Sequence, residues 1–146
     1  MKVEIRVEPG AAQQVIIITD HLTPEIEALA KSLENKPFDR LTAYSERGVK
    51  LIPTDEILRI YSESQQIRVE TLSGSVHTLR GRLYEYEEQL APRRFVRISN
   101  SEIVNGSMIT GMDFSLSGTI CLILKNGVKT YVSRRYVQRI KKLFDV

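Results

Sequence analysis

Basic side chains gather near the C-terminus in a pattern that could bind an anion. Residues 134–142 hold five Lys or Arg and no acid. At helical spacing, Arg135, Arg139 and Lys142 share one side of a helix, and an apolar stripe lies roughly opposite. Such cations form strong hydrogen bonds with phosphate and carboxylate oxygens. The pattern therefore predicts contact with a polyanion, while a solvated basic face is the commoner explanation of any one such run.

The predicted helix has an unusual first turn. Ser133 is a suitable N-cap, because its hydroxyl can accept a hydrogen bond from a free amide of that turn. Arg134 and Arg135 follow, whereas the positive end of a helix dipole favours Asp or Glu by about 0.3 to 1 kcal/mol per residue. A phosphate would compensate for this unfavourable charge. We therefore expect a functional site here that its ligand completes.

Residue types that could carry catalysis or bind a metal form no recognisable motif. There is no Gly-rich phosphate loop, no G-x-S-x-G and no H-E-x-x-H. Two histidines and one cysteine, Cys121, give no metal-binding cluster and no internal disulfide. Glu85, Glu87 and Glu88 lie on a predicted helix, and an exposed acidic face explains them better than a general acid/base group. We expect no enzyme, no cofactor and no small-molecule substrate.

Length and composition point to a soluble protein of one domain with a core, or of one domain plus a small appendage. The chain has 146 residues, of which 42% are hydrophobic and 27% charged. No apolar run approaches the roughly 20 residues of a membrane span, and the N-terminus lacks a signal-peptide core, so we expect a cytoplasmic protein. The net charge is +3, but residues 1–40 carry five bases and seven acids, so the positive charge lies in the remainder. That distribution suits a polyanion binder.

Residues 1–40 predict a small ββα unit. Alternating charged and apolar residues predict a strand over residues 3–7, and a second strand is expected over residues 14–19 after a Pro-Gly turn. A helix is expected to open at Thr23–Ile26, with Pro at its first position, and to end at residues 35–37. Because the unit is too small for a substantial core of its own, we expect it to support dimerisation or to contact a partner.

Residues 41–146 predict a second domain of short strands and turns. The helix expected at residues 82–90 interrupts them, and Asn126-Gly127 is the strongest hairpin signal. The predicted fold class is mainly β (α+β): elongated antiparallel sheets of roughly eight to ten short strands with two or three short helices. The expected strands cover residues 41–46, 49–52, 57–62, 67–72, 76–79, 108–114, 119–125 and 129–132.

A polar segment, FVRISNSEIVN at residues 95–105, lies between these predicted elements. Its apolar residues imply anchoring in a core, whereas Asn and Ser side chains crowd between them. Asn and Ser are common turn formers, which satisfy neighbouring backbone groups. On the pattern alone, that is the preferred interpretation.

The chain from about Ile52 to Phe144 resembles the LytTR DNA-binding domain of bacterial transcription regulators. The resemblance rests on the strand pair ILRIYSES and IRVETLSG, the helix LYEYEEQL, the segment FVRISNSEIVN, the hairpin ICLILKNGVKTYVSRRYV and the closing helix, in that order. It implies antiparallel sheets whose loops enter successive major grooves of a duplex. Family members typically carry a receiver domain in front. Forty residues cannot hold one, so the chain looks like a stand-alone regulator.

The resemblance also implies particular DNA contacts. Three positions match base-reading residues of the family: Gln66 in a hairpin turn, Asn100 on a loop and Arg135 after the last strand. An Asn amide can pair with adenine, and an Arg fork with guanine, in the major groove. The candidate phosphate contacts are Arg93, Arg94, Arg97, Arg134, Arg139 and Lys142.

The partners that the resemblance implies are double-stranded DNA with paired sites, a second protomer in a homodimer on that DNA, and a small inhibitory membrane protein. A second hypothesis stays open beside this one. The chain could be a protein-interaction module whose basic face docks on an acidic partner or an anionic membrane surface. Salt-sensitive binding to anionic vesicles, without sequence preference on DNA, would favour that alternative.

Overall fold

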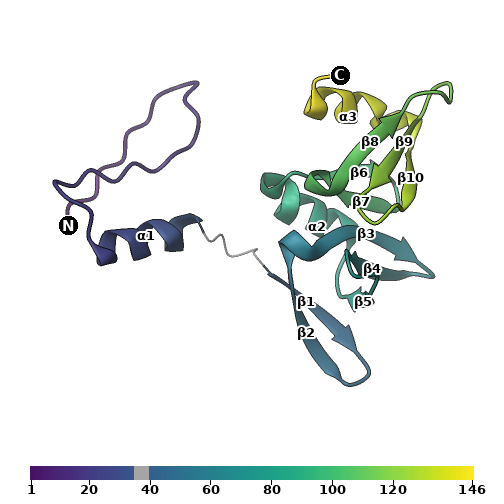
Figure 1. Cartoon of the computed structure of the whole chain (residues 1–146), viewed down its shortest axis with the longest axis horizontal. Helices are drawn as coiled ribbons and strands as arrows, with labels where there is room; N and C mark the ends of the chain where they lie inside the picture. Colours follow the sequence, from purple (N-terminus) through teal and green to yellow (C-terminus); the bar gives the residue numbers. More distant parts are fainter. Residues whose placement is uncertain (35–39) are drawn as a thin grey trace. The chain divides into compact units, whose positions relative to one another are not determined.

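The computed structural model describes residues 1–34 and 40–146 (Figure 1). The chain divides into two compact units, Met1–Lys36 and Pro37–Val146. In the first unit the predicted helix is present as α1 (Pro24–Glu34). The Thr23 hydroxyl accepts a hydrogen bond from the Ile26 amide at 3.2 Å, as an N-cap does. The predicted end of this helix at residues 35–37 lies outside the described residues.

The two strands predicted for the first unit are wrong for the single chain. No strand is found in residues 1–23, although the predicted turn forms: the Ala11 amide donates to the Glu8 carbonyl at 3.0 Å. A two-stranded hairpin is marginal in water unless its apolar face packs on something. Here the side chains of Val3, Ile5 and Val7 are 80–88% exposed. The alternating pattern indicates β propensity without a partner strand.

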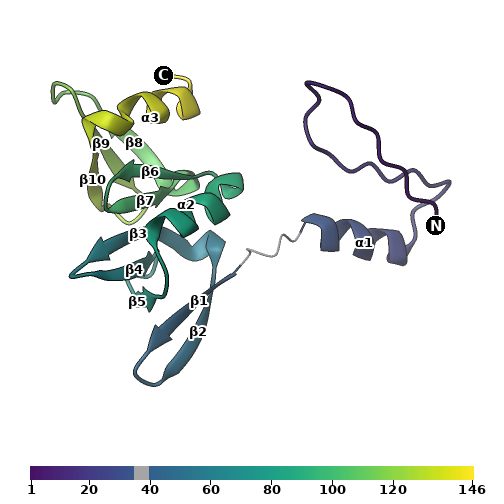
Figure 2. The ribbon, with the colours of Figure 1, turned by 180° about the vertical axis from the view of Figure 1, so that it is seen from behind.

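The second unit contains two antiparallel sheets, which confirms the mainly β fold class (Figures 1 and 2). The strands are β1 (Arg40–Ser45), β2 (Gly48–Pro53), β3 (Ile57–Glu63), β4 (Gln66–Thr71), β5 (Val76–Leu79), β6 (Phe95–Ser99), β7 (Glu102–Asn105), β8 (Ile109–Asp113), β9 (Ile120–Leu124) and β10 (Lys129–Val132). Seven strands pair in the order β2-β1-β5-β4-β3-β7-β6, and three in the order β10-β9-β8. The α-helices are α2 (Leu83–Leu90) and α3 (Val137–Phe144).

The segment FVRISNSEIVN is a hairpin rather than a run of turns. Its flanks form β6 and β7, and the turn is confined to Asn100 and Ser101. Both strands are buried on two sides, with Phe95 and Ile103 in one core and Val96 and Val104 in the other. A strand buried on both faces lacks the regular polar alternation of a half-exposed strand, which is why the sequence pattern did not reveal it.

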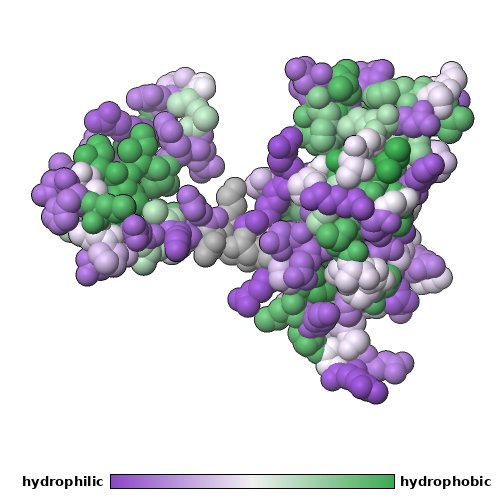
Figure 3. Space-filling model, in the orientation of Figure 1, coloured by the Kyte–Doolittle hydropathy of each residue, from purple (hydrophilic) through white to green (hydrophobic). Residues whose placement is uncertain are grey.

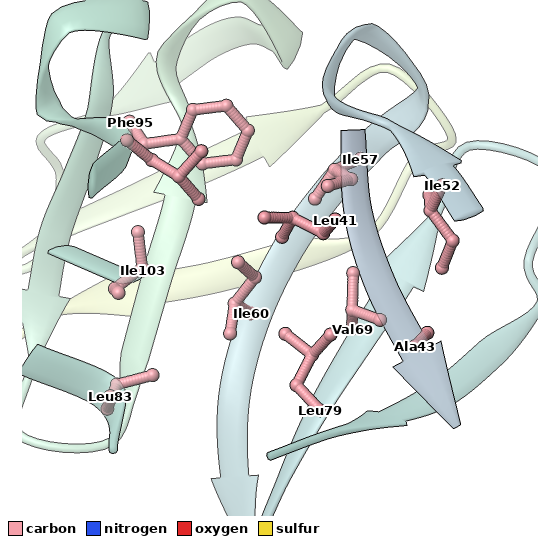
Figure 4. Close-up of a cluster of buried hydrophobic side chains, with 11 residues drawn as sticks. Leu41, Ala43, Ile52, Ile57, Ile60, Val69, Leu79, Leu83, Phe95 and Ile103 are labelled. Carbon is pink, nitrogen blue, oxygen red and sulfur yellow. The ribbon is translucent and has the colours of Figure 1, made fainter. Parts of the chain in front are cut away.

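Two hydrophobic clusters hold the second unit together. The first lies on one face of the seven-stranded sheet and includes Leu83 and Leu90 of α2; Figure 4 shows side chains from several strands meeting there. The second lies between the two sheets and includes Tyr136 and Ile140 near the C-terminus. Ile140 has no exposed surface, so the closing helix is anchored on the sheets. The neighbouring strands β3, β7 and β6 contribute to both clusters.

One amide side chain lies in this core. Asn105, at the end of β7, is 2% exposed, and its Nδ2 donates to the Ile57 carbonyl at 2.8 Å. Its Oδ1 accepts from the amide and the hydroxyl of Ser107, at 3.1 and 2.7 Å. These bonds connect the start of β3 to the chain after β7. Asn105 is therefore a structural residue, unlike Asn100 in the same segment.

Candidate nucleic-acid interface

Three chain segments meet at one end of the seven-stranded sheet. They are the β3–β4 hairpin, the β6–β7 turn and the 3-10 turn η4 (Arg134–Tyr136) that precedes α3. The Ser62 amide donates to the Ser101 carbonyl at 2.8 Å, which ties the first segment to the second. The Ser133 amide donates to the Ile98 carbonyl at 2.9 Å, which ties the second to the third. Backbone bonds therefore fix the three predicted base-reading positions at the same end of the fold.

Gln66 lies at the base of the β3–β4 turn and is exposed. It pairs with Glu63 across the hairpin. Ser64 and Gln65 between them have φ values of +50° and +66°, so both central residues are left-handed, as a type I′ turn requires. This turn matches the twist of the strands that it joins, so the hairpin presents Gln66 from a defined position.

Arg97 holds the turn that carries Asn100. Its guanidinium donates to the Ser99 carbonyl and to the Asn100 carbonyl, both at 2.6 Å. It also pairs with the Glu87 carboxylate on α2 at 3.2 Å, and only 13% of its side chain is exposed. The Asn100 side chain itself remains exposed. Arg97 is thus engaged by the protein rather than presented to solvent.

Arg135 and Arg139 flank one aromatic ring. Their guanidinium carbons lie 5.7 and 5.3 Å from the ring centroid of Tyr136, within the range of a cation–π contact. The Tyr136 hydroxyl lies 3.5 Å from Asn100 Oδ1, at the limit of a hydrogen bond. Because Tyr136 is 8% exposed, a nearly buried ring connects the Asn100 turn to both arginines.

The predicted cap of the closing helix is wrong. The Ser133 hydroxyl makes no capping hydrogen bond, and α3 begins only at Val137. The Ser133 backbone is used instead: its amide bonds to Ile98 on the edge strand β6, and its carbonyl accepts from the Tyr136 amide at 2.9 Å. Docking on the sheet edge therefore sets the start of this segment. Arg134 and Arg135 lie in the 3-10 turn, so the dipole argument for an anion at the first α-helical turn does not apply to them.

The other predicted cations fall into two groups. The Arg134 guanidinium lies against Gly118, because a Cβ added at Gly118 would be 3.0 Å from Arg134 Nε. Lys142 is exposed on α3. Arg139 is 60% exposed, with Nη1 3.8 Å from Glu87. Arg93 and Arg94 lie before β6, at the end opposite Asn100, which is about 20 Å away along the strand. The structure thus brings Arg134 and Arg139 to the three loops but not Arg93 or Arg94.

The sequence did not predict the part that two residues, Glu87 and Tyr136, take in this site. Glu87 was expected on a solvated acidic face, yet it pairs with Arg97 across to the sheet. Tyr136 was expected only as part of the apolar stripe of the helix, yet its ring and hydroxyl face the predicted contacts. The sequence offers one partial signal, because Tyr can bury its ring and still use its hydroxyl.

A charged network lies just behind the β6–β7 turn. Arg59 on β3 pairs with Glu70 at 3.2 Å and with Glu102, the first residue of β7, at 3.5 Å. Burial raises the pKa of the Glu102 carboxyl, and the neighbouring Thr130 and Arg59 act in the opposite direction. The network joins strands β3, β4 and β7 behind the turn.

Comparison with known proteins places this fold in a family. The family model described as the LytTr DNA-binding domain matches residues 47–145. An uncharacterized HTH-type transcriptional regulator of Staphylococcus aureus strain NCTC 8325 is 34% identical over 106 residues, which are 73% of this chain and 71% of that protein. Its counterpart in strain MRSA252 is 33% identical over the same shares. The solved LytTr DNA-binding domain of a Bacillus cereus response regulator superposes with a TM-score of 0.69 at 23% identity, covering 74% of this chain and 98% of that domain.

The name of the Staphylococcus aureus relatives refers to a helix-turn-helix, which the described part of this chain does not contain. Its α-helices are separated from one another by strands, and the three predicted base-reading positions lie on turns or, for Gln66, at the strand end beside one. The Bacillus cereus domain shares this arrangement of sheets. The matching family is a class of DNA-binding domain and not a class of enzyme. The extent of the match confirms the resemblance inferred from the sequence, and the chain belongs to the LytTR DNA-binding domain family.

Proposed function

We propose that this protein is a transcription regulator that binds double-stranded DNA sequence-specifically, through turns rather than through a recognition helix. The observation that carries the proposal is the convergence of Gln66, Asn100 and Arg135 at one end of the sheet, fixed by two backbone hydrogen bonds between their segments. Membership of the family supports it, as does the naming of the Staphylococcus aureus relatives as transcriptional regulators.

The side chains have distinct roles in this proposal. Gln66, Asn100 and Arg135 contact base edges in the major groove, where amide and guanidinium groups distinguish adenine and guanine. Arg134, Arg139 and Lys142 neutralise phosphates beside them, which positions the protein without selecting sequence. Arg97 and Tyr136 act as positioning residues, because each contacts the turn that carries Asn100.

Arg93 and Arg94 have a smaller part in the proposal. Their place at the far end of β6 separates them from the three turns. Phe144, the last residue of α3, lies close to the Arg94 backbone beside Gly106. Phosphate contacts from Arg93 and Arg94 would therefore fall on DNA next to the C-terminal end of α3, outside the groove that Arg135 enters.

We further propose that two protomers occupy paired sites on the DNA.

The protein would act in the cytoplasm, where a small membrane protein could restrain it. Among the described residues, no helix is both long and apolar enough to cross a bilayer. In this proposal, residues 1–40 contact the membrane protein, because the second unit carries the DNA-binding surface.

Selection of bound duplexes from a random pool tests the proposed function. The full chain is incubated with the pool at about 0.15 M salt, and recovered duplexes are amplified over several rounds. We expect a common motif, repeated at a fixed spacing. If no motif emerged and the chain bound anionic vesicles in a salt-sensitive manner, it would be a protein or membrane interaction module instead.

Replacing Arg139 by Ala is expected to weaken binding to all duplexes alike. A phosphate contact carries no sequence information, so its loss lowers the slope of log affinity against log salt by about one unit. The measurement is fluorescence anisotropy with selected and scrambled duplexes at several salt concentrations. Lys142→Ala serves as a matched variant on the same helix. A change in the ratio of the two affinities would contradict the role given to Arg139.

Replacing Tyr136 separates its ring from its hydroxyl. Tyr136→Phe keeps the ring between Arg135 and Arg139 and loses only the 3.5 Å contact to Asn100, so we expect at most about a fivefold loss of affinity for the selected duplex. Tyr136→Leu removes the aromatic ring as well and is expected to lose clearly more, because cation–π contacts contribute about 0.5 to 2 kcal/mol. Thermal unfolding of both variants provides the stability control. Equal losses of affinity would show that the ring does not position the arginines.

A further inference from the structure

The first segment of the chain is apolar on alternate residues and has no partner strand among the described residues. Val3, Ile5 and Val7 are 80–88% exposed, and no strand pairing is found in residues 1–23. Figure 3 shows apolar side chains gathered on the visible face of the unit Met1–Lys36. None of the residues of α1 is buried either. This unit therefore presents apolar surface that a further strand could cover.

A turn marks the end of the segment. Gly10 has a φ of +83° and follows Pro9, and the Ala11 amide bonds to the Glu8 carbonyl at 3.0 Å. Pro followed by a left-handed Gly is the pattern of a type II turn. The turn therefore ends the segment Lys2–Glu8.

Residues at equal distances on either side of Ile5 in Lys2–Glu8 carry opposite charges or are both apolar. When two copies lie antiparallel with Ile5 opposite Ile5, Lys2 faces Glu8 and Glu4 faces Arg6 of the other copy, and the Val residues face each other. The apolar residues then share one face of the pair and the charged residues share the other, because side chains alternate along a strand. Every cross-strand pair is complementary, and opposite charges at such positions are stabilising.

Other alignments of the two copies form fewer attractive charge pairs than the four of this register. Antiparallel pairing centred on Glu4 places Lys2 opposite Arg6, and pairing centred on Arg6 places Glu4 opposite Glu8. Parallel pairing in register places each charge opposite itself. A shift by one residue mixes the charged and apolar faces. Parallel pairing offset by two residues gives three attractive pairs, and antiparallel pairing centred on Val3 or Val7 gives two. The register centred on Ile5 therefore has the most attractive pairs, and it has the two-fold symmetry of a homodimer.

We infer that Lys2–Glu8 is a dimerisation strand, which pairs antiparallel with the same segment of a second copy about a two-fold axis at Ile5. The Val and Ile side chains of the two strands form one apolar face of the pair. The proposal explains why β-prone residues stay unpaired in the single chain. It does not depend on DNA binding, because it concerns the free protein.

Charge reversal at two positions tests the interface in the full chain without DNA. In the homodimer of Glu4→Arg the introduced arginine faces Arg6 of the other copy, and in that of Arg6→Glu the introduced glutamate faces Glu4. Each variant alone is expected to have a dimer dissociation constant raised by about tenfold or more, because two attractive pairs become repulsive. An equimolar mixture of the two variants restores both attractive pairs, so we expect it to dimerise like the parent. Sedimentation equilibrium measures each case.

The mixture also controls for a contact within one chain. Glu4 and Arg6 form an exposed ion pair at 3.2 Å in the single chain, and both variants lose it. That loss persists in the mixture, so recovery of the dimer requires pairing between copies. A monomeric parent, single variants that dimerise like the parent, or a mixture that stays monomeric would each overturn the proposal.

A cysteine at the two-fold axis gives an independent readout. In Ile5→Cys the two thiols face each other across Cα atoms about 4.5 to 5.5 Å apart, a distance that a disulfide can bridge. In the control Val3→Cys, on the same face, the two cysteines lie about 13 Å apart along the strands. The native Cys121 is buried. Mild oxidation should crosslink the first variant and not the second; equal crosslinking of both, or of neither, would overturn the register.

Discussion

Replacing Arg135 by Ala is expected to lower affinity for the selected duplex by about 1 to 3 kcal/mol, which is roughly 5-fold to 150-fold. The guanidinium lies in a short turn that is tied to the edge strand β6, so its approach to the duplex is fixed by the fold. A planar fork in this position can donate two hydrogen bonds to guanine. Discrimination at one base position should disappear, while other positions keep theirs. Anisotropy titrations with the selected duplex and its single-base variants measure both effects.

Arg135→Lys is the matched control for this prediction. Lysine keeps the positive charge but lacks the planar fork, so the salt dependence of binding should remain and the discrimination should fall. If Lys preserved the full base preference, Arg135 would act as a phosphate contact. A parental ratio of selected to scrambled affinity in Arg135→Ala would likewise contradict its assignment as a base-reading residue.

Replacing Asn105 by Ala is expected to lower the free energy of unfolding by about 2 to 4 kcal/mol. The side chain is 2% exposed, and its removal leaves the carbonyl of the buried residue Ile57 without this donor, whereas water can reach the exposed Ser107. Buried polar groups that lose a partner are destabilising, because water does not replace it. Urea unfolding followed by circular dichroism measures the effect.

Asn126→Ala provides the control for Asn105. Asn126 lies in an exposed hairpin turn, where its Oδ1 accepts from the Val128 amide at 3.0 Å. Water can replace that bond, so we expect a loss below about 1 kcal/mol. Equal losses for the two variants would show that the buried amide of Asn105 does not stabilise the core.

The sequence predicted most of the second unit because its strands are short, apolar and separated by strong turn signals. The Asn126-Gly127 hairpin forms between β9 and β10 as expected, and the closing helix buries Ile140 on the sheets. The family resemblance added the positions of Gln66, Asn100 and Arg135. Their roles in DNA binding stay predictions, whereas their common location follows from the strand pairing and from the Ser133–Ile98 backbone bond.

What the sequence did not reveal depends on contacts between distant segments. The residues of β6 and β7 lack alternation because both faces of these strands are buried. Arg97 is of a residue type that often contacts phosphate. In the fold, its guanidinium donates to the Ser99 and Asn100 carbonyls instead. The strand at residues 3–7 was predicted from alternation alone, which indicates β propensity and says nothing of whether a partner strand is available.

The central claim is that Arg135 contacts a guanine edge in the major groove, and a thermodynamic cycle across the interface tests it most directly. Each guanine of the selected duplex is replaced in turn by 7-deazaguanine, which lacks the N7 acceptor of the major groove. Affinities are measured for the parent and for Arg135→Ala. We predict one position at which the replacement weakens the parent by about 1 kcal/mol or more and leaves Arg135→Ala nearly unaffected. Equal effects on the two proteins at every guanine would contradict the claim.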